Sequence, residues 1–583
     1  MAGSRGRLHG LEKALSFYLE FCDNKIDETV FNEGDKEMAI LNQTVGEIVR
    51  EQATKFPETE AYVYPERNIR KTYAEFDRET DELAKAFMGL GIEKGEHIAI
   101  WSDNKREWLL SQYATGKMGG VLVTVNTSYQ ASELEYLLKQ SDSTTLILGE
   151  EFKGTDYIEV LRQVCPELEH AEKGRLDSPK LPHLKRVIVM SENSYPGIYT
   201  WSEFEAFAKG ISDGQLEQRF ASMDPEDVIN IQYTSGTTGF PKGVMLTHRN
   251  VVNNGRLVGD MMNLDENDRL CIPVPFFHCF GCVLGTLAAV THGTTMVIAE
   301  QFEPKRVLQM VQDEKCTALH GVPTMFIAEL NHPEFGSFDT STLRTGIMAG
   351  STCPIEVMKK VISDMGASEI TIAYGQTESS PVITQTGKDD AIEKRVATVG
   401  KPHDDVEVKI IDPATGEEVV KGMPGELCTR GYLIMKGYYK NEEATKEAID
   451  PEGWLHTGDI AVEDEDGYIS ITGRIKDMVI RGGENIYPRE IEEFLYQHPS
   501  VQDVQVVGVP DPKYGEELMA WVILKDGEKL DADELRAYCK GKIAHHKIPR
   551  YIEFIDEYPM TASGKIQKFK LREMSEEIAE KVN

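Results

Sequence analysis

Apolar positions along the chain follow two different periods, and their succession predicts a mixed α/β fold. Over residues 72–90 the apolar side chains recur at roughly helical spacing, and Gly91 follows them. The next apolar run, residues 97–101, has the length and composition of a buried strand. A helix that leads into a buried strand is the repeating step of a parallel sheet covered by helices. The pattern therefore predicts parallel sheets with flanking helices.

Further short apolar runs lie near helical segments and extend this pattern: 144–148, 186–190, 228–232 and 295–299. The last hundred or so residues differ, because two strand candidates, 500–509 and 517–525, are separated only by a turn-rich segment, and a helix follows from Asp531. This arrangement predicts a small α+β unit at the C-terminal end. Its boundary is expected close to Lys476, within a segment that lies between two short apolar strands.

Composition narrows the class of protein. The 583 residues suggest three or four domain-sized units, and 63 basic against 97 acidic side chains give a net charge of −34. Such an acidic chain is an improbable binder of nucleic acid. The most apolar stretch, residues 283–299, is interrupted by polar side chains and is too short for a membrane span, and we see no export signal. Nine cysteines spread over a long chain predict a reducing, cytoplasmic location.

The segment Tyr233–Gly243 carries the sharpest chemical signal. It follows an apolar run and combines glycines, which let backbone N–H groups approach an anion, with hydroxyl donors and one lysine. It is not a Walker A loop, because Lys242 follows Pro241 and no Ser or Thr comes next. The residues expected to cradle phosphate are Thr234, Ser235, Gly236, Thr237, Thr238, Gly239 and Lys242.

This segment resembles the phosphate-binding signature of the adenylate-forming superfamily, which includes acyl-CoA synthetases, peptide-synthetase adenylation domains and luciferases. Four further motifs of that superfamily follow in order: Tyr374–Glu378, Thr457–Asp459, Gly473–Asp477 and Ser563–Lys565. The resemblance extends from about Leu41 to Arg572 and covers nearly the whole chain.

The resemblance implies the domain plan. An N-terminal body, residues 1–475, would contain several subdomains with parallel sheets, flanking helices and a small β-barrel. A small mobile α+β domain, residues 476–583, would follow. The family's spacing places the hinge between them at Lys476.

The resemblance also implies roles around the nucleotide. Mg²⁺ in such sites takes one or two carboxylates together with phosphate oxygens, and Glu378 is the expected ligand. Tyr374 would stack on adenine, Thr377 would contact the α-phosphate, and Asp459 would bind the ribose hydroxyls. Arg474 would reach the ribose or the phosphates. The remaining residues expected at ATP or AMP are Gly350, Ser351, Gly375 and Gln376.

Lys565 lies at the end of a segment with turn character, which predicts a loop that presents its ammonium group. By the family motif, this charge would bind both the attacking carboxylate and the α-phosphate. The groups expected to act in the chemistry are Lys565, Glu378, Thr234 and His278.

The acyl pocket is expected around the aromatic stretch that contains His278, whose matching residue in acyl-CoA synthetases lines the carboxylate end of the pocket. The pocket residues expected from this stretch are Phe276, Phe277, His278, Gly281 and Val283. Cys279 and Cys282 form a C-x-x-C, a pattern seen in redox pairs and zinc sites. Because the chain has no second C-x-x-C, we interpret these cysteines as part of the pocket.

Two half-reactions follow from the resemblance. A carboxylate attacks MgATP to give an acyl-adenylate and pyrophosphate, and CoA then takes the acyl group after the C-terminal domain rotates. The residues expected at CoA are Arg481, Gly482 and Gly483. The motifs look most like the branch that acts on medium-chain fatty acids. Four alternatives remain: a CoA ligase for an alicyclic or aromatic acid, acyl transfer to a carrier protein, a luciferase and an inactive nucleotide sensor. The sequence does not settle the oligomeric state, and a homodimer is one state that it leaves open.

Overall fold

The computed structural model describes residues 40–582 apart from 235–240, 352, 483 and 562–563. The helical periodicity over residues 72–90 is confirmed by α3 (Tyr73–Gly89). Its start is fixed by a capping box, in which the Thr72 hydroxyl accepts a hydrogen bond from the Glu75 amide and the Glu75 carboxylate accepts one from the Thr72 amide. The expected α/β class is likewise confirmed, because the strand candidates all form strands and helices separate most of them.

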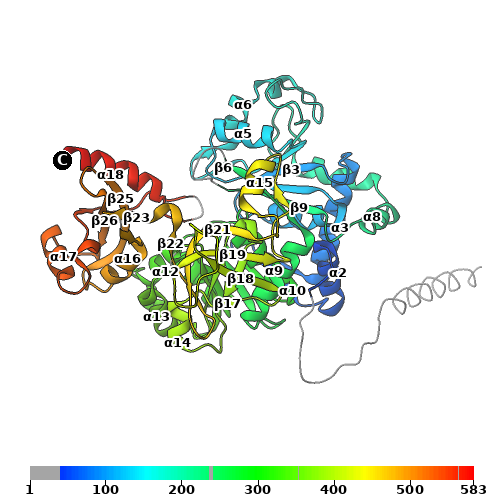
Figure 1. The fold of residues 1–583 in the computed structure, drawn as a ribbon. Coiled ribbons are helices and arrows are strands. Elements are labelled where there is room, and N and C mark those ends of the chain that lie inside the picture. Colours follow the sequence, from blue (N-terminus) through cyan, green and yellow to red (C-terminus); the bar gives the residue numbers. More distant parts are fainter. Residues whose placement is uncertain (1–39, 235–240, 352, 483, 562–563, 583) are drawn as a thin grey trace, which may run out of the picture. The chain divides into compact units, whose positions relative to one another are not determined.

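Two large sheets build the N-terminal part of the chain (Figure 1). The first has nine strands, parallel in its centre and antiparallel at both edges. In spatial order its strands are β17 (Lys401–Pro402), β16 (Val382–Gln385), β15 (Thr371–Gly375), β14 (Thr345–Ala349), β13 (Ala318–Gly321), β11 (Arg269–Ile272), β12 (Thr295–Ile298), β1 (Glu60–Tyr64) and β2 (Ile69–Thr72).

The second sheet has seven strands, of which five run parallel and two close one edge in antiparallel fashion. In order they are β20 (Gly437–Tyr438), β10 (Lys242–Thr247), β9 (Val228–Thr234), β4 (Val121–Thr124), β3 (His97–Trp101), β5 (Thr145–Leu148) and β8 (Arg186–Val189). Two short strands, β6 (Glu151–Phe152) and β7 (Thr155–Asp156), form a separate ribbon.

Buried helices join the two sheets. The largest hydrophobic cluster contains side chains from both sheets and from α3, α4 (Arg106–Met118) and α9 (His248–Met261). Eleven of the thirteen residues of α4 are buried, as expected for a helix covered on all sides. The other helices of this part are α2 (Val45–Lys55), α5 (Ala131–Gln140), α6 (Tyr157–Val164), α7 (Trp201–Glu205), α8 (Asp213–Phe220), a π-helix (Phe280–Leu287), α10 (Ala288–Thr291), α11 (Pro304–Asp313), α12 (Pro323–Leu330), α13 (Ile355–Asp364), α14 (Ile392–Ala397) and α15 (Glu442–Ala448).

A small antiparallel sheet takes the place of the expected β-barrel. Its four strands, in order, are β18 (Val406–Ile411), β19 (Gly425–Gly431), β21 (Leu455–Glu463) and β22 (Ile469–Arg474). In the register of the described residues its two outer strands are not paired with each other, so this sheet is open rather than closed.

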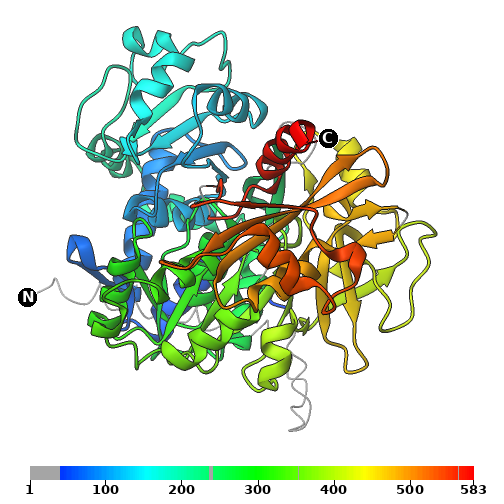
Figure 2. The same ribbon diagram turned by 90° about the vertical axis from the view of Figure 1, so that its left-hand side faces the viewer.

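The C-terminal end of the chain forms the predicted α+β unit (Figure 2). Strands β24 (Glu484–Ile486), β23 (Val479–Arg481), β26 (Gly515–Leu524) and β25 (Val501–Asp511) follow one another, and β27 (Tyr551–Phe554) pairs with β26. Its helices are α16 (Pro488–Tyr496), α17 (Ala532–Cys539) and α18 (Lys568–Val582), and α18, drawn in red, packs along β25. Two hydrophobic clusters made only of residues from 479–579 stabilise this unit.

Within the described part of the chain, no helix combines the length and the apolar character needed to cross a lipid bilayer. The eight cysteines that the structure describes are all buried, and none forms a disulfide.

Candidate active site

The Lys565 side chain reaches from the C-terminal unit to His278 in the N-terminal part. Thr561 holds the backbone of the lysine, because the Lys565 amide donates to the Thr561 hydroxyl at 3.0 Å and the Lys565 carbonyl accepts from the Thr561 amide at 2.7 Å. The preceding residue is fixed to α12, since the Thr324 hydroxyl donates to the Gly564 carbonyl at 3.2 Å. Lys565 Nζ then lies 3.5 Å from His278 Nε2. The predicted loop therefore presents the lysine to the predicted pocket residue.

Two hydrogen-bond donors face each other at this contact. His278 Nδ1 accepts the Phe280 amide at 3.2 Å, so the ring proton of the neutral imidazole belongs on Nε2. Burial lowers the pKa of His278 well below its usual value, and the charge of Lys565 lowers it further. Because an ammonium group and an N–H cannot bond to each other, the space between them suits an acceptor. A carboxylate or phosphate oxygen is such an acceptor.

Gly350 lies beside the lysine, in a backbone conformation that favours glycine. Its φ of +90° is a left-handed conformation that favours glycine. A Cβ atom there would lie 3.4 Å from Lys565 Cε and 3.2 Å from a methyl group of Val322. Ser351, the next predicted residue, is exposed beside it.

The Thr457–Asp459 motif forms a bulge on β21. Cys428 of β19 lies opposite His456, whereas Glu426 lies opposite Ile460, so β21 accommodates two extra residues. Gly458 adopts a φ of +70° within this bulge. The turn is tied to β19, because the Gly458 amide donates to Glu426 Oε1 at 3.0 Å and the Thr457 hydroxyl donates to the Leu427 carbonyl at 2.6 Å. Strand β19 thus fixes the segment that presents the Asp459 carboxylate.

Asp459, Tyr374 and Arg474 meet at this carboxylate. The Tyr374 hydroxyl donates to Asp459 Oδ2 at 2.7 Å, and Arg474 Nε donates to Oδ1 at 3.1 Å. Asp459 and Arg474 are cross-strand partners in β21 and β22, which explains their contact. Burial raises the pKa of Asp459, while Arg474 and Tyr374 oppose that rise. Three residues predicted separately for the adenine, the ribose and the phosphates therefore form one polar cluster.

Glu378 belongs to a second cluster that includes a residue missed in the sequence. Glu378 lies in the short helical turn Thr377–Ser379 and is buried. Tyr438 of β20 donates its hydroxyl to Glu378 Oε1 at 2.8 Å, and its ring lies 4.3 Å from Lys242 Nζ. Tyr438 thus links the carboxylate to the predicted phosphate-binding lysine. Nothing near Tyr438 in the sequence marks it, since it reaches Glu378 only through the pairing of β20 with β10.

The ends of the predicted phosphate loop lie side by side. Thr234 ends β9, Lys242 begins β10, and these two residues are direct partners in the antiparallel pair. Ser235, Gly236, Thr237, Thr238 and Gly239 lie outside the described residues. The loop is therefore anchored at both ends beside the Lys242 and Tyr438 contact.

The predicted pocket residues occupy different environments. Phe276 is fully buried, and its ring centre lies 5.3 Å from that of Trp108. A Cβ atom on Gly281 would lie 2.2 Å from the Pro275 carbonyl oxygen, so this glycine permits a close backbone approach. The Phe277 side chain is 8% exposed. Phe276 and Gly281 thus pack tightly against neighbouring residues and hold the aromatic stretch in place.

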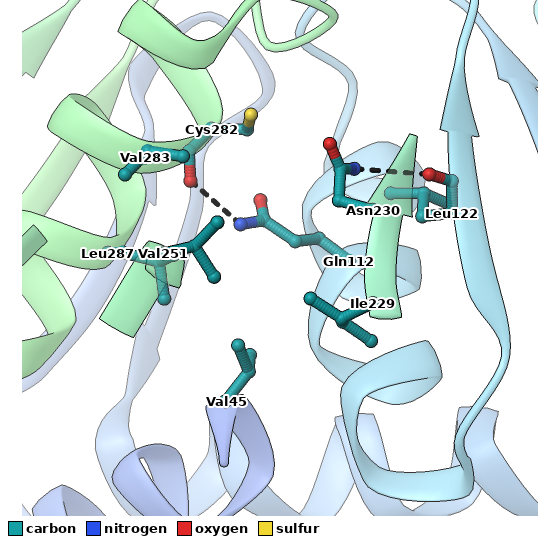
Figure 3. A pocket seen from close by; sticks show the side chains of 9 residues that line it. All are labelled: Val45, Gln112, Leu122, Ile229, Asn230, Val251, Cys282, Val283 and Leu287. Carbon is teal, nitrogen blue, oxygen red and sulfur yellow. Dashed lines mark hydrogen bonds between the residues drawn. The ribbon is translucent and has the colours of Figure 1, made fainter. Parts of the chain in front are cut away.

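Val283 borders a small internal cavity (Figure 3). The cavity holds about 20 Å³, which is room for one water-sized group. One polar atom in it, Asn230 Oδ1, has no hydrogen-bond partner among the described residues, although Asn230 Nδ2 donates to the Leu122 carbonyl at 3.1 Å. The residues that line the cavity are Val45, Gln112, Leu122, Ile229, Asn230, Val251, Cys282, Val283 and Leu287.

The C-x-x-C runs from the Lys565 contact toward this cavity. Cys279 Sγ lies 3.6 Å from His278 Nδ1 and 3.9 Å from the Thr377 hydroxyl. Burial raises the pKa of Cys279 to about 11, so the thiol stays protonated at neutral pH. Cys282 accepts a hydrogen bond from Gln232 Nε2 at 3.2 Å. Cys279 therefore connects the pocket histidine to the Tyr374–Glu378 motif, a contact that the sequence did not reveal.

The residues expected at CoA and at the hinge lie in the C-terminal unit. Arg481 donates to Glu517 at 2.5 Å and to the His546 carbonyl at 3.2 Å, which fixes its side chain on β23. Gly482 has a φ of +62°, and Gly483 lies outside the described residues. Lys476 is exposed in a short helical turn, and the next residue, Asp477, pairs with Arg572 of α18.

Comparison with known proteins places the chain in a family. The model of the AMP-binding enzyme family matches residues 49–439, and that of the AMP-binding enzyme C-terminal domain matches residues 490–565. The chain is 60% identical over 539 residues to the putative acyl-CoA synthetase YngI of Bacillus subtilis (strain 168), covering 92% of this chain and 98% of that protein. It is 43% identical over 543 residues to the human mitochondrial medium-chain acyl-CoA ligase ACSF2, covering 92% of this chain and 88% of that protein.

Solved structures agree with this assignment. The anthranilate CoA ligase AuaEII in complex with anthranoyl-AMP matches with a TM-score of 0.82 and 26% identity, over 94% of this chain and all of that one. ATP-bound MatB from Rhodopseudomonas palustris matches with a TM-score of 0.79 and 26% identity, over 92% of this chain and all of that one. The chain therefore belongs to the AMP-binding enzyme family, and within it to the AMP-forming acyl-CoA synthetases.

Proposed function

We propose that this acyl-CoA synthetase activates a medium-chain fatty acid with MgATP and transfers the acyl group to CoA. The observation that carries the proposal is the pair of donors, Lys565 Nζ and His278 Nε2, which face each other 3.5 Å apart. The medium-chain preference is supported by the 43% identity to human ACSF2, which is named a medium-chain acyl-CoA ligase. A cytoplasmic location and a homodimer stay predictions.

In the first half-reaction, an oxygen of the fatty acid would bind between Lys565 and His278. The ammonium group would hold this oxygen near the α-phosphate and stabilise the negative charge that crowds there as the new bond forms. Neutral His278 would donate from Nε2 without adding a second positive charge. Asp459 would exchange its bonds to Tyr374 and Arg474 for the ribose hydroxyls, and Arg474 would then reach the phosphates.

Glu378 fits the role of a magnesium ligand. Tyr438 binds one of its carboxylate oxygens, and the other can ligate a hard cation, which prefers oxygen donors. When bound with ATP, Mg²⁺ neutralises part of the phosphate charge. Lys242 would add a donor from the opposite side, since Tyr438 lies between Glu378 and Lys242.

The second half-reaction would need a different arrangement of the C-terminal unit, residues 476–583. As long as Lys565 contacts His278, its side chain occupies the acyl end of the site. We therefore propose that the unit turns about Lys476, which withdraws Lys565 and presents the Arg481–Gly483 segment to CoA. Short exposed segments such as the one around Lys476 are typical hinges.

A substrate panel tests the proposed acid. AMP release would be measured with straight-chain acids from acetate to palmitate, with benzoate and with cyclohexanecarboxylate. We expect a maximum of kcat/KM at medium chain lengths. A maximum at benzoate or cyclohexanecarboxylate would favour the alternative of an aromatic or alicyclic acid, for which the fold likeness to the anthranilate CoA ligase is the specific support. Thioester formation on a carrier protein but not on CoA would contradict the proposal.

The Tyr438→Phe variant tests the proposed magnesium ligand. Losing the hydroxyl leaves a buried Glu378 oxygen without its donor, and a hydrogen bond to a charged group contributes about 1.5–3 kcal/mol. We expect the Mg²⁺ concentration for half-maximal activity to rise about tenfold. The matched control is Tyr439→Phe, whose hydroxyl bonds Asp142 at 3.0 Å instead. Equal magnesium dependence in both variants would show that Tyr438 does not position Glu378.

The pH dependence of adenylation tests the charge of Lys565. Burial lowers the pKa of Lys565 from its ordinary value, and Arg474 lowers it further. The protonated form is the active one, so kcat/KM should fall as the pH rises through this lowered pKa, which lies below that of free lysine. In Lys565→Arg the side chain stays charged, and the alkaline decline should disappear even though the rate is lower. An unchanged decline in that variant would assign it to another group.

A further inference from the structure

Three side chains of different chemistry converge where β19 pairs with β21. Cys428 and His456 are direct cross-strand partners, and Glu426 lies two residues before Cys428 on the same face of β19. One ligand atom from each residue lies within 4.8 Å of the other two. The proposed reaction uses neither Cys428 nor His456. We propose that Glu426, Cys428 and His456 bind a zinc ion.

The two distances from His456 to the other ligand atoms are close to those of a tetrahedral zinc site, and the third pair lies within 4.8 Å. Cys428 Sγ lies 3.5 Å from His456 Nδ1, and His456 Nδ1 lies 3.1 Å from Glu426 Oε2. With usual zinc bond lengths and tetrahedral angles, a sulfur and a nitrogen ligand are about 3.6 Å apart, and a nitrogen and an oxygen ligand are about 3.4 Å apart. Zinc can therefore enter after small side-chain shifts, and water can take the fourth position.

The remaining polar atoms of His456 and Glu426 have neighbours that suit a metal site. His456 Nε2 lies 3.8 Å from Asp450 Oδ2, so the ring can direct its N–H to this carboxylate and keep Nδ1 free for the metal. Glu426 Oε1 accepts the Gly458 amide, which leaves Oε2 for the ion. A carboxylate behind a histidine ligand is one of the common outer partners in protein zinc sites.

The donor atoms of this site favour zinc, unlike those of Glu378, where magnesium is proposed. The site is also accessible from solvent. A set of one sulfur, one nitrogen and one oxygen donor suits zinc, whereas Mg²⁺ prefers oxygen alone. The Cys428 thiol is fully buried, next to the other two ligand atoms. Zinc binding would displace this thiol proton to solvent and leave a thiolate ligand. The His456 side chain is 31% exposed and gives the ion a route from solvent.

The site lies next to the nucleotide motif. Glu426 would bridge the ion and the Gly458 amide, and Gly458 belongs to the turn that presents Asp459. Zinc would thus stabilise this turn through Glu426. The binding itself does not depend on the proposed acid or on the adenylation chemistry.

Metal binding to the full-length protein tests the proposal. Protein stripped by a chelator would be titrated with Zn²⁺ by calorimetry and with Co²⁺ by absorbance. We expect one ion per chain, tetrahedral cobalt bands and a thiolate-to-cobalt charge-transfer band. Cys428→Ser should abolish the charge-transfer band, and His456→Gln should weaken binding by more than Asp450→Asn, which removes only the outer partner and should cost about tenfold or more.

Cys165→Ser is the matched control. It removes another buried thiol, one that lies 3.4 Å from a Glu167 carboxylate oxygen, and it should leave the cobalt spectrum unchanged. The proposal is overturned if the charge-transfer band survives in Cys428→Ser, because the sulfur ligand would then be elsewhere. Should that variant fail to fold, His456→Gln decides, since its partly exposed ring can be replaced without opening the core. Wild-type affinity in His456→Gln would equally overturn the site.

Discussion

Replacing Lys565 by alanine is expected to abolish acyl-adenylate formation while leaving thioester formation from supplied acyl-adenylate largely intact. Only the first half-reaction needs a charge between the carboxylate and the α-phosphate, and in the described arrangement Lys565 Nζ is 3.5 Å from His278 Nε2. The loss of one such donor typically costs about a hundredfold to a thousandfold in rate. Acid-dependent exchange of pyrophosphate into ATP measures the first step, and thioester release from synthetic acyl-AMP and CoA measures the second.

Lys570→Ala supplies the control for this experiment. Lys570 lies five residues further on, at the start of α18, and is exposed, so its loss changes the charge of the same unit without touching His278. Both half-reactions should stay at the wild-type rate. If Lys565→Ala instead lowers the two half-reactions equally, the lysine acts on folding or on the placement of the whole unit, and its assignment to adenylation fails.

The fold class, and the polar residues proposed for the site, could be predicted from the sequence because both depend on local patterns. Buried strands show in short apolar runs, and α3 shows in its spacing and its capping box. Lys565, Glu378 and Asp459 each lie in a short motif that is recognisable without knowledge of its partners. Their mutual contacts did not follow from these motifs.

What the sequence did not show comes from pairing between distant strands. Tyr438 reaches Glu378 because β20 adds to the edge of β10, and Glu426 reaches Gly458 because β21 bulges against β19. Neither register is visible in a local window. The aromatic stretch around His278 is a similar case, because hydrophobicity alone does not show which of its rings line a pocket. Phe276, for example, packs against Trp108.

The charge of the proposed substrates is complementary to the local charge of the site and not to the net charge of the chain. The chain carries −34, whereas ATP and CoA are anions and are repelled by such a field. Within the site, Lys242 lies against an aromatic ring, Arg474 against a carboxylate and Lys565 against an imidazole. In the proposed site, these fixed contacts hold positive charge near the positions expected for phosphate and carboxylate oxygens. A surface that repels nucleic acid is therefore compatible with a site that binds a nucleotide.

Lys476→Pro is expected to keep the first half-reaction and to impair the second, the opposite of the result expected for Lys565→Ala. Proline fixes φ near −65° and also restricts the preceding residue, so the short turn Ile475–Asp477 could no longer absorb a rotation. Pyrophosphate exchange should continue near the wild-type rate, because the described arrangement already brings Lys565 to His278.

Thioester formation by the same variant, measured with synthetic acyl-AMP and CoA, should fall at least tenfold, since it needs the C-terminal unit to turn. Lys476→Ala is the control, because it removes the side chain but keeps the backbone free, and both steps should proceed. Asp477 pairs with Arg572 on α18, so the turn is tied to the C-terminal unit and its rigidity is transmitted to that unit directly. A wild-type rate of thioester formation in Lys476→Pro would mean that the rotation takes place at another residue.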